Sequence, residues 1–130
     1  MSNLEIVQGF YAGAAAGDMD RIRSILAPEL SWRQTPGWPD AGHFRTPDEV
    51  VSGVFGKLAG EWDDFKGVPA EFICDGDRVV VLGTYSGTSK ATGRSFEAPF
   101  AHVFRVRDGV IVEMRQYADT KLVHDAWRDD

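Results

Sequence analysis

The chain has one cysteine, Cys74, among its 130 residues. A lone thiol excludes an internal disulfide, and it is typical of proteins kept in a reducing compartment. The three histidines are scattered and form no close ligand pair with one another or with Cys74, so the sequence offers no structural zinc site. We therefore expect no metal, no other cofactor and a cytoplasmic location.

Positive charge and long apolar runs are also scarce. Lys and Arg number 14 against 20 Asp and Glu, which gives a formal net charge of −6. Nucleic acids and anionic membranes attract proteins with a concentrated positive field, so we expect neither as a partner. No apolar run approaches the roughly 20 residues that span a bilayer, and residues 1–5 lack the basic start and apolar core of a signal peptide.

The composition that is present is ordinary for a globular protein, with 43% hydrophobic and 26% charged residues. A chain of this length is the size of one domain and can bury roughly two-thirds of the surface of its unfolded state. No internal repeat, linker or low-complexity segment interrupts it. The sequence therefore predicts a single domain over residues 1–130.

Two short helical patterns open the chain. Apolar residues recur at helical spacing over residues 6–14, and Gly17 is a typical helix terminator. Asp18 predicts the N-cap of a second helix, which Pro28 stops, and residues 29–34 predict a strand.

A third helix has the clearest local signal. Thr46, Pro47 and Glu49 have the spacing of a capping box with proline in the first turn. Trp62 and Phe65 follow in a segment rich in Gly and Asp, which predicts a loop.

The second half alternates β-branched and aromatic residues between turn motifs. These motifs are Asp75-Gly76-Asp77, Thr92-Gly93 and Asp108-Gly109. They predict an antiparallel meander whose strands cover residues 68–74, 78–89, 94–107 and 110–119, with a last helical turn within residues 120–128. Helices first and a meander of long, bending strands after predict a segregated α+β fold.

Several stretches coincide with a known pattern: Ala16-Gly17-Asp18, Leu30-Ser31-Trp32, Thr46-Pro47 and the hairpin over residues 106–113. Together, over about residues 4–122, they resemble the nuclear transport factor 2-like (NTF2-like) superfamily. The nearest branch is the SnoaL-like group, with ketosteroid isomerase and polyketide cyclases as distant relatives. The resemblance implies a cone of the cystatin-like α+β type, a curved antiparallel or mixed sheet wrapped around about three N-terminal helices. It also implies an apolar pocket inside the cone and a homodimer through the outer sheet face.

The residues that carry chemistry in those relatives are replaced here. Ketosteroid isomerase uses a first-helix tyrosine, an aspartate base and a protonated aspartic acid; the matching positions are Phe10, Gln34 and His102. SnoaL-like cyclases use a histidine, which His102 matches, and a last-strand aspartate, which Gln116 replaces. Asp119 is the nearest carboxylate, but its odd offset from Gln116 places it on the opposite face of a regular strand.

Gln34, His102 and Gln116 remain as a polar set expected to face the pocket. Amides both donate and accept hydrogen bonds and an imidazole does either, so the set would orient a carbonyl or hydroxyl of an otherwise apolar ligand. Only His102 could act as an acid or base near pH 7, with Gln116 bonded to one ring nitrogen. A structural role for His102 is the alternative.

Apolar candidates for contact with the ligand are Phe10, Trp32, Trp38, Trp62, Tyr85 and Met114. Core packing is the ordinary role of large aromatic side chains, and Met114 could equally fill the cone. Trp38 lies in a rigid turn at residues 35–40, which we expect near the cavity mouth as a lid.

Three functions are compatible with these residues. The first is a SnoaL-like domain of undetermined specific activity that binds a small apolar or cyclic molecule in its pocket. The alternative is an enzyme of isomerase, cyclase or dehydratase type that uses His102 as acid or base. The third is a non-catalytic structural or interaction dimer whose cone is filled by side chains.

Overall fold

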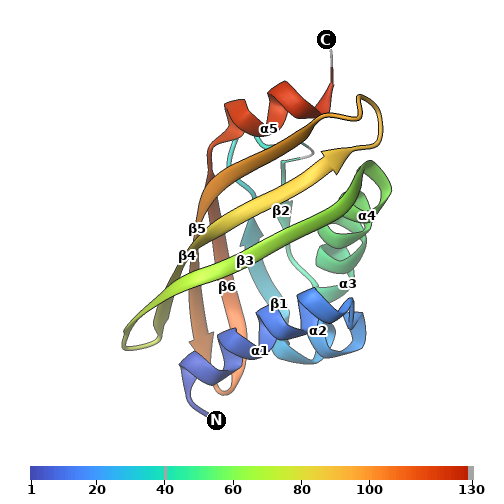
Figure 1. Ribbon diagram of the computed structural model, residues 1–130. Coiled ribbons are helices and arrows are strands. Elements are labelled where there is room, and N and C mark those ends of the chain that lie inside the picture. The colour runs from blue at the N-terminus through green and yellow to red at the C-terminus, as the bar shows by residue number, and fades with distance from the viewer. Residues whose placement is uncertain (40, 129–130) are drawn as a thin grey trace.

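The computed structural model describes residues 1–39 and 41–128; Asp40, the last residue of the predicted turn, lies outside them. A six-stranded sheet curves around helices in an α+β arrangement (Figure 1), as predicted. The strands are β1 (Leu26–Arg33), β2 (His43–Phe44), β3 (Trp62–Asp75), β4 (Arg78–Ser89), β5 (Ser95–Arg107) and β6 (Val110–Ala118). The helices are α1 (Asn3–Ala16), α2 (Met19–Ile25), α3 (Pro47–Val50), the π-helical turn η1 (Val51–Phe55), α4 (Gly56–Glu61) and α5 (Thr120–Trp127).

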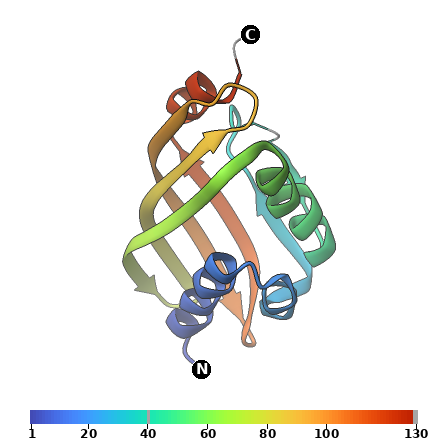
Figure 2. The ribbon, with the colours of Figure 1, turned by 45° about the vertical axis from the view of Figure 1, so that its right-hand side comes forward.

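The sheet is mixed and stays open. Its strand order is β2-β1-β6-β5-β4-β3, in which β1 and β6 run parallel and the other neighbours run antiparallel. Helix α1 crosses the inner face and contacts β3 to β6, while α5 lies at the opposite end of the sheet from α1 (Figures 1 and 2). The inner face is thereby enclosed by α1 and by the α3–η1–α4 segment.

Local capping explains where α1 and α2 begin and end. The Ser2 hydroxyl accepts a hydrogen bond from the Glu5 backbone, and the Glu5 carboxylate accepts one from the Ser2 backbone. Gly17 closes α1 in the left-handed region at φ 67°. The Asp18 carboxylate then caps α2, as predicted, but α2 ends at Ile25, and Pro28 lies within β1.

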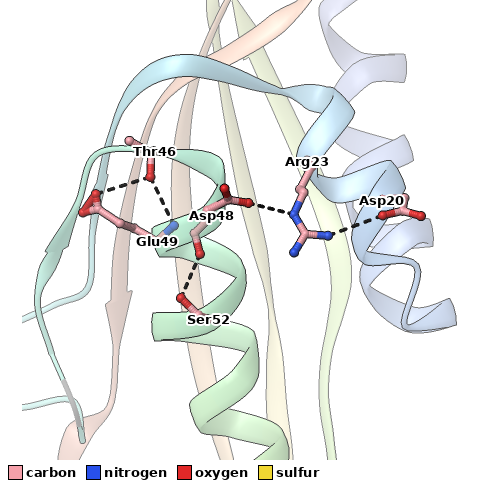
Figure 3. Close-up of polar contacts among 6 residues, drawn as sticks. All are labelled: Asp20, Arg23, Thr46, Asp48, Glu49 and Ser52. Carbon is pink, nitrogen blue, oxygen red and sulfur yellow. Dashed lines mark hydrogen bonds and ion pairs between the residues drawn. The ribbon is translucent and has the colours of Figure 1, made fainter.

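The third predicted helix is the continuous segment α3–η1–α4. The Thr46 hydroxyl accepts from the backbone N–H of Glu49, as predicted, while the Glu49 carboxylate bonds the Thr46 hydroxyl instead of the backbone (Figure 3). Asp48 also forms an ion pair with Arg23 of α2 at 3.0 Å, which ties the two helices together. The Arg23 side chain is partly exposed and that of Asp48 largely so, and the pair therefore stabilises the fold only modestly.

The loop predicted around Trp62 and Phe65 is wrong, because β3 already begins at Trp62. The pairing of β3 with β4 is interrupted by a bulge between Asp63 and Lys66, where Asp64 adopts φ 54°. Aspartate tolerates this left-handed conformation better than most residues, and a bulge is what bends a strand of 14 residues. The Gly and Asp signal therefore marks a bend within a strand.

The C-terminal segment is longer than the single turn predicted. It forms α5, and Asp119 is its N-cap, with the carboxylate accepting a hydrogen bond from the Leu122 backbone. This role accounts for the Asp119 carboxylate and keeps it out of the polar set inside the cone. Within the described residues, no helix is long and apolar enough to cross a membrane.

Candidate functional site

A cavity of about 870 Å³ opens inside the cone, between α1, η1–α4, the first half of β3 and the inner face of the sheet. All nine side chains that the sequence suggested for the pocket line it: Phe10, Trp32, Gln34, Trp38, Trp62, Tyr85, His102, Met114 and Gln116. Met114 is almost fully buried in the wall and leaves the cavity open. The described structure therefore does not support the filled cone.

The walls are built from aromatic rings that hold each other in place. The Trp38 ring lies 5.0 Å from that of Tyr85, and the Phe10 ring lies 5.6 Å from that of Trp32 in an edge-to-face arrangement. Such contacts fix the ring planes at little cost in side-chain entropy. Trp38, expected near the mouth as a lid, is only 5% exposed and forms part of the inner wall beside Tyr85. The exposed residues at the mouth belong to other segments.

The mouth lies between the end of α1, helix α4 and the start of β3. Its exposed lining residues include Ala15, Asp63 and Lys90. Asp64 and Lys66 also lie there and form an ion pair at 3.4 Å. The charges of this site are thus at the rim, and the interior is uncharged.

A row of polar side chains crosses the inner face of the sheet. His102 of β5 is directly paired with Gln116 of β6, and the Thr35 backbone N–H donates to Gln116 Oε1 at 3.1 Å. Gln34, one residue earlier, accepts from the indole N–H of Trp32 at 3.1 Å through its Oε1. The three polar residues picked from the sequence therefore lie on neighbouring strands or beside them.

His102 is held between two tyrosines. The Tyr11 hydroxyl lies 2.6 Å from His102 Nδ1, and the Tyr85 hydroxyl lies 2.5 Å from Nε2. Both ring nitrogens are thus occupied, and the ring itself stacks on Phe100 at 4.1 Å. The Gln116 amide donates to the Tyr85 hydroxyl at 3.0 Å, so the prediction that Gln116 contacts His102 directly is wrong. The Tyr85 hydroxyl lies between the two, since it contacts His102 Nε2 and accepts from Gln116.

Burial decides the protonation states in this row. Desolvation lowers the pKa of His102 to about 3, because nothing nearby stabilises an imidazolium. Desolvation also raises the pKa of Tyr11 and of Tyr85 above the ordinary value for a phenol. The trio is therefore neutral at pH 7, and what it supplies to a bound molecule is directional hydrogen bonding.

Tyr11 was missed by sequence reasoning, which assigned the neighbouring Phe10 to the pocket and Tyr11 to the apolar face of the helix. In α1 both rings face inward, with centroids 5.2 Å apart, and both line the cavity. The signal that could have found it was present: a hydroxyl-bearing residue next to the position where a relative carries tyrosine. Consecutive helical residues differ by about 100° in direction, so two neighbours can both reach a wide cavity.

The described part of the chain contains no group of three or more Cys, His, Asp or Glu side chains that could hold a metal ion.

The chain matches known proteins over nearly its whole length. The family model of the SnoaL-like domain matches residues 7–114. An NTF2-like protein from Burkholderia thailandensis is 38% identical, with a TM-score of 0.96 and 99% of each chain covered. TerC, solved in a co-crystal with polyporic acid, is 27% identical, with a TM-score of 0.87 and 98% of each chain covered.

Similarity of fold extends further than similarity of sequence. IdmH, a candidate polyketide cyclase from Streptomyces antibioticus, is 23% identical with a TM-score of 0.81, covering 97% of this chain and 98% of its own. Comparison with curated proteins finds no match. The family model, the curved sheet and its enclosing helices agree with the resemblance seen in the sequence: the chain belongs to the SnoaL-like domain family of NTF2-like proteins.

Proposed function

We propose that this protein binds a small, largely apolar, ring-containing molecule inside the cone. The observation that carries the proposal is the open cavity of about 870 Å³ with aromatic walls and a buried, neutral polar row at its back. Pockets of this kind bury most of an apolar ligand and use a few fixed polar groups to orient it. Without a ligand, the aromatic walls of the cavity would lack the van der Waals contacts that an apolar molecule gives them.

The comparisons support a ligand of this kind. TerC was co-crystallised with polyporic acid, and it shares the length and the fold of this chain. IdmH, a candidate cyclase, shares the fold at lower sequence identity. It supports the shape of the pocket, and we do not transfer its catalytic activity to this chain.

The probe we choose to test binding is anthracene-2-sulfonate, a fluorescent three-ring molecule whose charge can stay at the rim. We expect saturable binding that Ala15→Trp weakens at least about tenfold, because Ala15 lines the mouth and an indole there narrows it. Ala12→Trp is the matched control, since Ala12 is exposed on the same helix and does not line the cavity. Fluorescence titration of the three proteins gives the dissociation constants. Equal binding by all three, or no saturable binding by any, would contradict the proposal.

A catalytic role is the second candidate, and the tyrosine–histidine–tyrosine trio is the observation in its favour. Because both nitrogens of His102 are occupied, any proton exchanged with a substrate would pass through a tyrosine hydroxyl. The burial of His102 argues against a rate that titrates near the ordinary pKa of histidine. If the wild-type protein converts a bound ligand and His102→Ala does not, an isomerase, cyclase or dehydratase activity that uses His102 is supported. If the variant converts the ligand equally well, His102 is not part of the mechanism.

We also propose that two copies associate through the outer sheet face. The exposed side chains of Leu82 on β4 and Tyr117 on β6 lie there in one row, on either side of the half-buried Ala101 of β5. Ile73 on β3 adds a further side chain that is 49% exposed. Sedimentation equilibrium is expected to give about twice the 14.4 kDa chain mass, and Leu82→Lys to give the single chain. A wild-type mass of one chain would exclude this dimer.

A further inference from the structure

Two arginines and a histidine lie side by side on the outer face of the sheet, away from the cavity. Trp32 and Met114 line the cavity, so the next residues along β1 and β6, Arg33 and Arg115, face outward. The parallel register pairs Arg33 directly with Arg115, and the antiparallel register pairs Arg33 with His43 of β2. We call these three side chains the arginine row. Like charges directly opposite one another destabilise a sheet, so the arginine row is held together at a cost to the fold.

Little negative charge offsets the arginine row. Among the described residues, its one ion pair joins Arg115 Nε to Glu113 at 3.3 Å. Arg33 makes no ion pair and no side-chain hydrogen bond within the described chain, and neither does Arg45, which directly follows β2. Both of these side chains are exposed. The protein has 20 acidic against 14 basic residues, so a shortage of acids does not explain why two arginines lack a partner.

Charged groups from three segments act on His43. Partial burial lowers the pKa of this histidine, and the positive charges of Arg45 and Arg33 lower it further. Glu49 of α3 acts in the opposite direction, but its carboxylate is bonded to the Thr46 hydroxyl (Figure 3). Both guanidiniums are therefore close enough to His43 to disfavour its cationic form, and an anion bound beside the ring would be attracted by both.

Ser31 and His43 supply a hydrogen-bond donor at the same place. Ser31 Oγ lies 2.8 Å from His43 Nε2, both side chains are half-buried, and neither has another side-chain partner among the described residues. If the serine donates, the ring proton lies on Nδ1; if Nε2 donates, the proton of the serine hydroxyl is unused. Either tautomer therefore leaves one donor for a ligand, and a protonated ring leaves two.

We propose that this edge of the outer face binds a phosphate group, either free phosphate or the phosphate of a small molecule. The binding side chains are Arg33, Arg45, Ser31 and His43. A guanidinium donates two parallel hydrogen bonds to phosphate oxygens, and such charge-assisted bonds are roughly twice as strong as neutral ones. A phosphate dianion also offsets the repulsion between Arg33 and Arg115.

The position of the site fits a small ligand. It lies on the face of the sheet opposite the cavity, so it is independent of the ligand proposed there. Strands β1 and β2 lie beyond β6 in the sheet, outside the row of β4 to β6 proposed for the dimer. The net charge of −6 repels large polyanions, which leaves a small phosphate-bearing molecule as the occupant.

Titration with inorganic phosphate, followed by NMR of the His43 ring near neutral pH and at low salt, tests the site. We expect a saturable shift with a dissociation constant of about 1 mM or below. Arg33→Gln is expected to weaken binding at least about fivefold, because it removes a two-bond contact. Arg21→Gln is the matched control: Arg21 is exposed on α2, and the variant has the same net charge. Phosphate is also expected to raise the pKa of His43, since an anion stabilises the imidazolium.

Stability gives a second measurement. Without phosphate, Arg33→Gln is expected to unfold at a temperature no lower than wild type, because a like-charge contact is removed. Phosphate should raise the unfolding midpoint of the wild type and of Arg21→Gln, with a smaller effect on Arg33→Gln.

Equal weakening by Arg33→Gln and Arg21→Gln would overturn the proposal, because phosphate would then respond to net charge alone. So would the absence of a saturable shift at His43, or acetate binding as tightly as phosphate. Methyl phosphate distinguishes the two sources of the group. Binding as tight as that of inorganic phosphate would show that the phosphate of a small molecule is accepted, whereas binding of inorganic phosphate alone would assign the site to the free ion.

Discussion

Lowering the pH from 7 to 4.5 is expected to remove about 2–3 kcal/mol of the free energy of unfolding through His102 alone. Burial lowers the pKa of this histidine to about 3 in the folded protein, whereas an unfolded chain has a histidine pKa near 6.5. Between these values the unfolded state binds a proton that the folded state does not bind. The stabilisation is therefore complete above about pH 6.5 and is lost as the pH falls, at about 1.4 kcal/mol per pH unit.

The measurement is urea denaturation at several pH values for wild type and His102→Gln, at one protein concentration. The carboxylates and the other histidines are common to both proteins, so their contributions cancel in the difference between the two slopes. Identical slopes would mean that the imidazole titrates equally in both states and that the neutral trio is wrong. If the variant does not fold, NMR of the wild-type ring serves instead: its signals should stay at their neutral positions down to pH 4.5.

Phe104→Ala is expected to cost about 3–5 kcal/mol of stability, the range seen for large aromatic side chains removed from a core. Phe104 has no exposed surface and lies against three rings of the site wall, with centroids 5.5 Å from Phe10, 6.0 Å from Tyr11 and 5.9 Å from His102. Its loss leaves a void beside the cavity and removes the support that holds Tyr11 against the histidine. We therefore expect weaker probe binding as well as a lower unfolding midpoint.

Leu122→Ala is the control for that experiment. Leu122 is 42% exposed on α5, so its truncation should change stability by about 0.5 kcal/mol or less. A cost for Phe104→Ala close to that of Leu122→Ala would show that the inner wall is loosely packed. In that case the distances between the histidine and its tyrosines would not be held by packing.

The proposed ligand binding depends on the protonation state of the tyrosine–histidine–tyrosine trio. The same burial that keeps His102 neutral gives the two tyrosines a fixed partner, and a neutral imidazole leaves one of the two tyrosine hydroxyl protons unused by the ring. A charged histidine would donate to both tyrosines, while the bonds of Gln116 to Thr35 and Tyr85 would keep their direction. Acidification is therefore expected to destabilise the fold before a folded protein with a protonated His102 is populated.

Local signals in the sequence identified most of the elements correctly. Asp18 and Thr46 cap helices and Gly17 ends the first helix, as predicted, because capping depends only on a few neighbouring residues. The turns at Gly76 and Gly109 have φ values of 60° and 79°, which glycine tolerates without strain. Local signals failed at Trp62, because the Gly- and Asp-rich composition that predicts a loop is also found in a strand bent by a bulge.

The candidate site was predicted less completely. The resemblance to the family named His102 and Gln116, and the strand register pairs them directly. Which atoms meet depends on segments far apart in the chain: Tyr11 is 91 residues from His102, and Tyr85 is 31 residues from Gln116. No periodicity within one element carries that information.

The sequence by itself determined the family and most of the helices and strands, because these follow from local patterns and from residue type. Tertiary structure alone decided that Tyr11 joins His102, that Gln116 contacts Tyr85, and that His102 is buried and neutral. The reason is geometric. Hydrogen bonds form only within about 3 Å and along defined directions, and those positions are set by how α1 packs into the curved sheet.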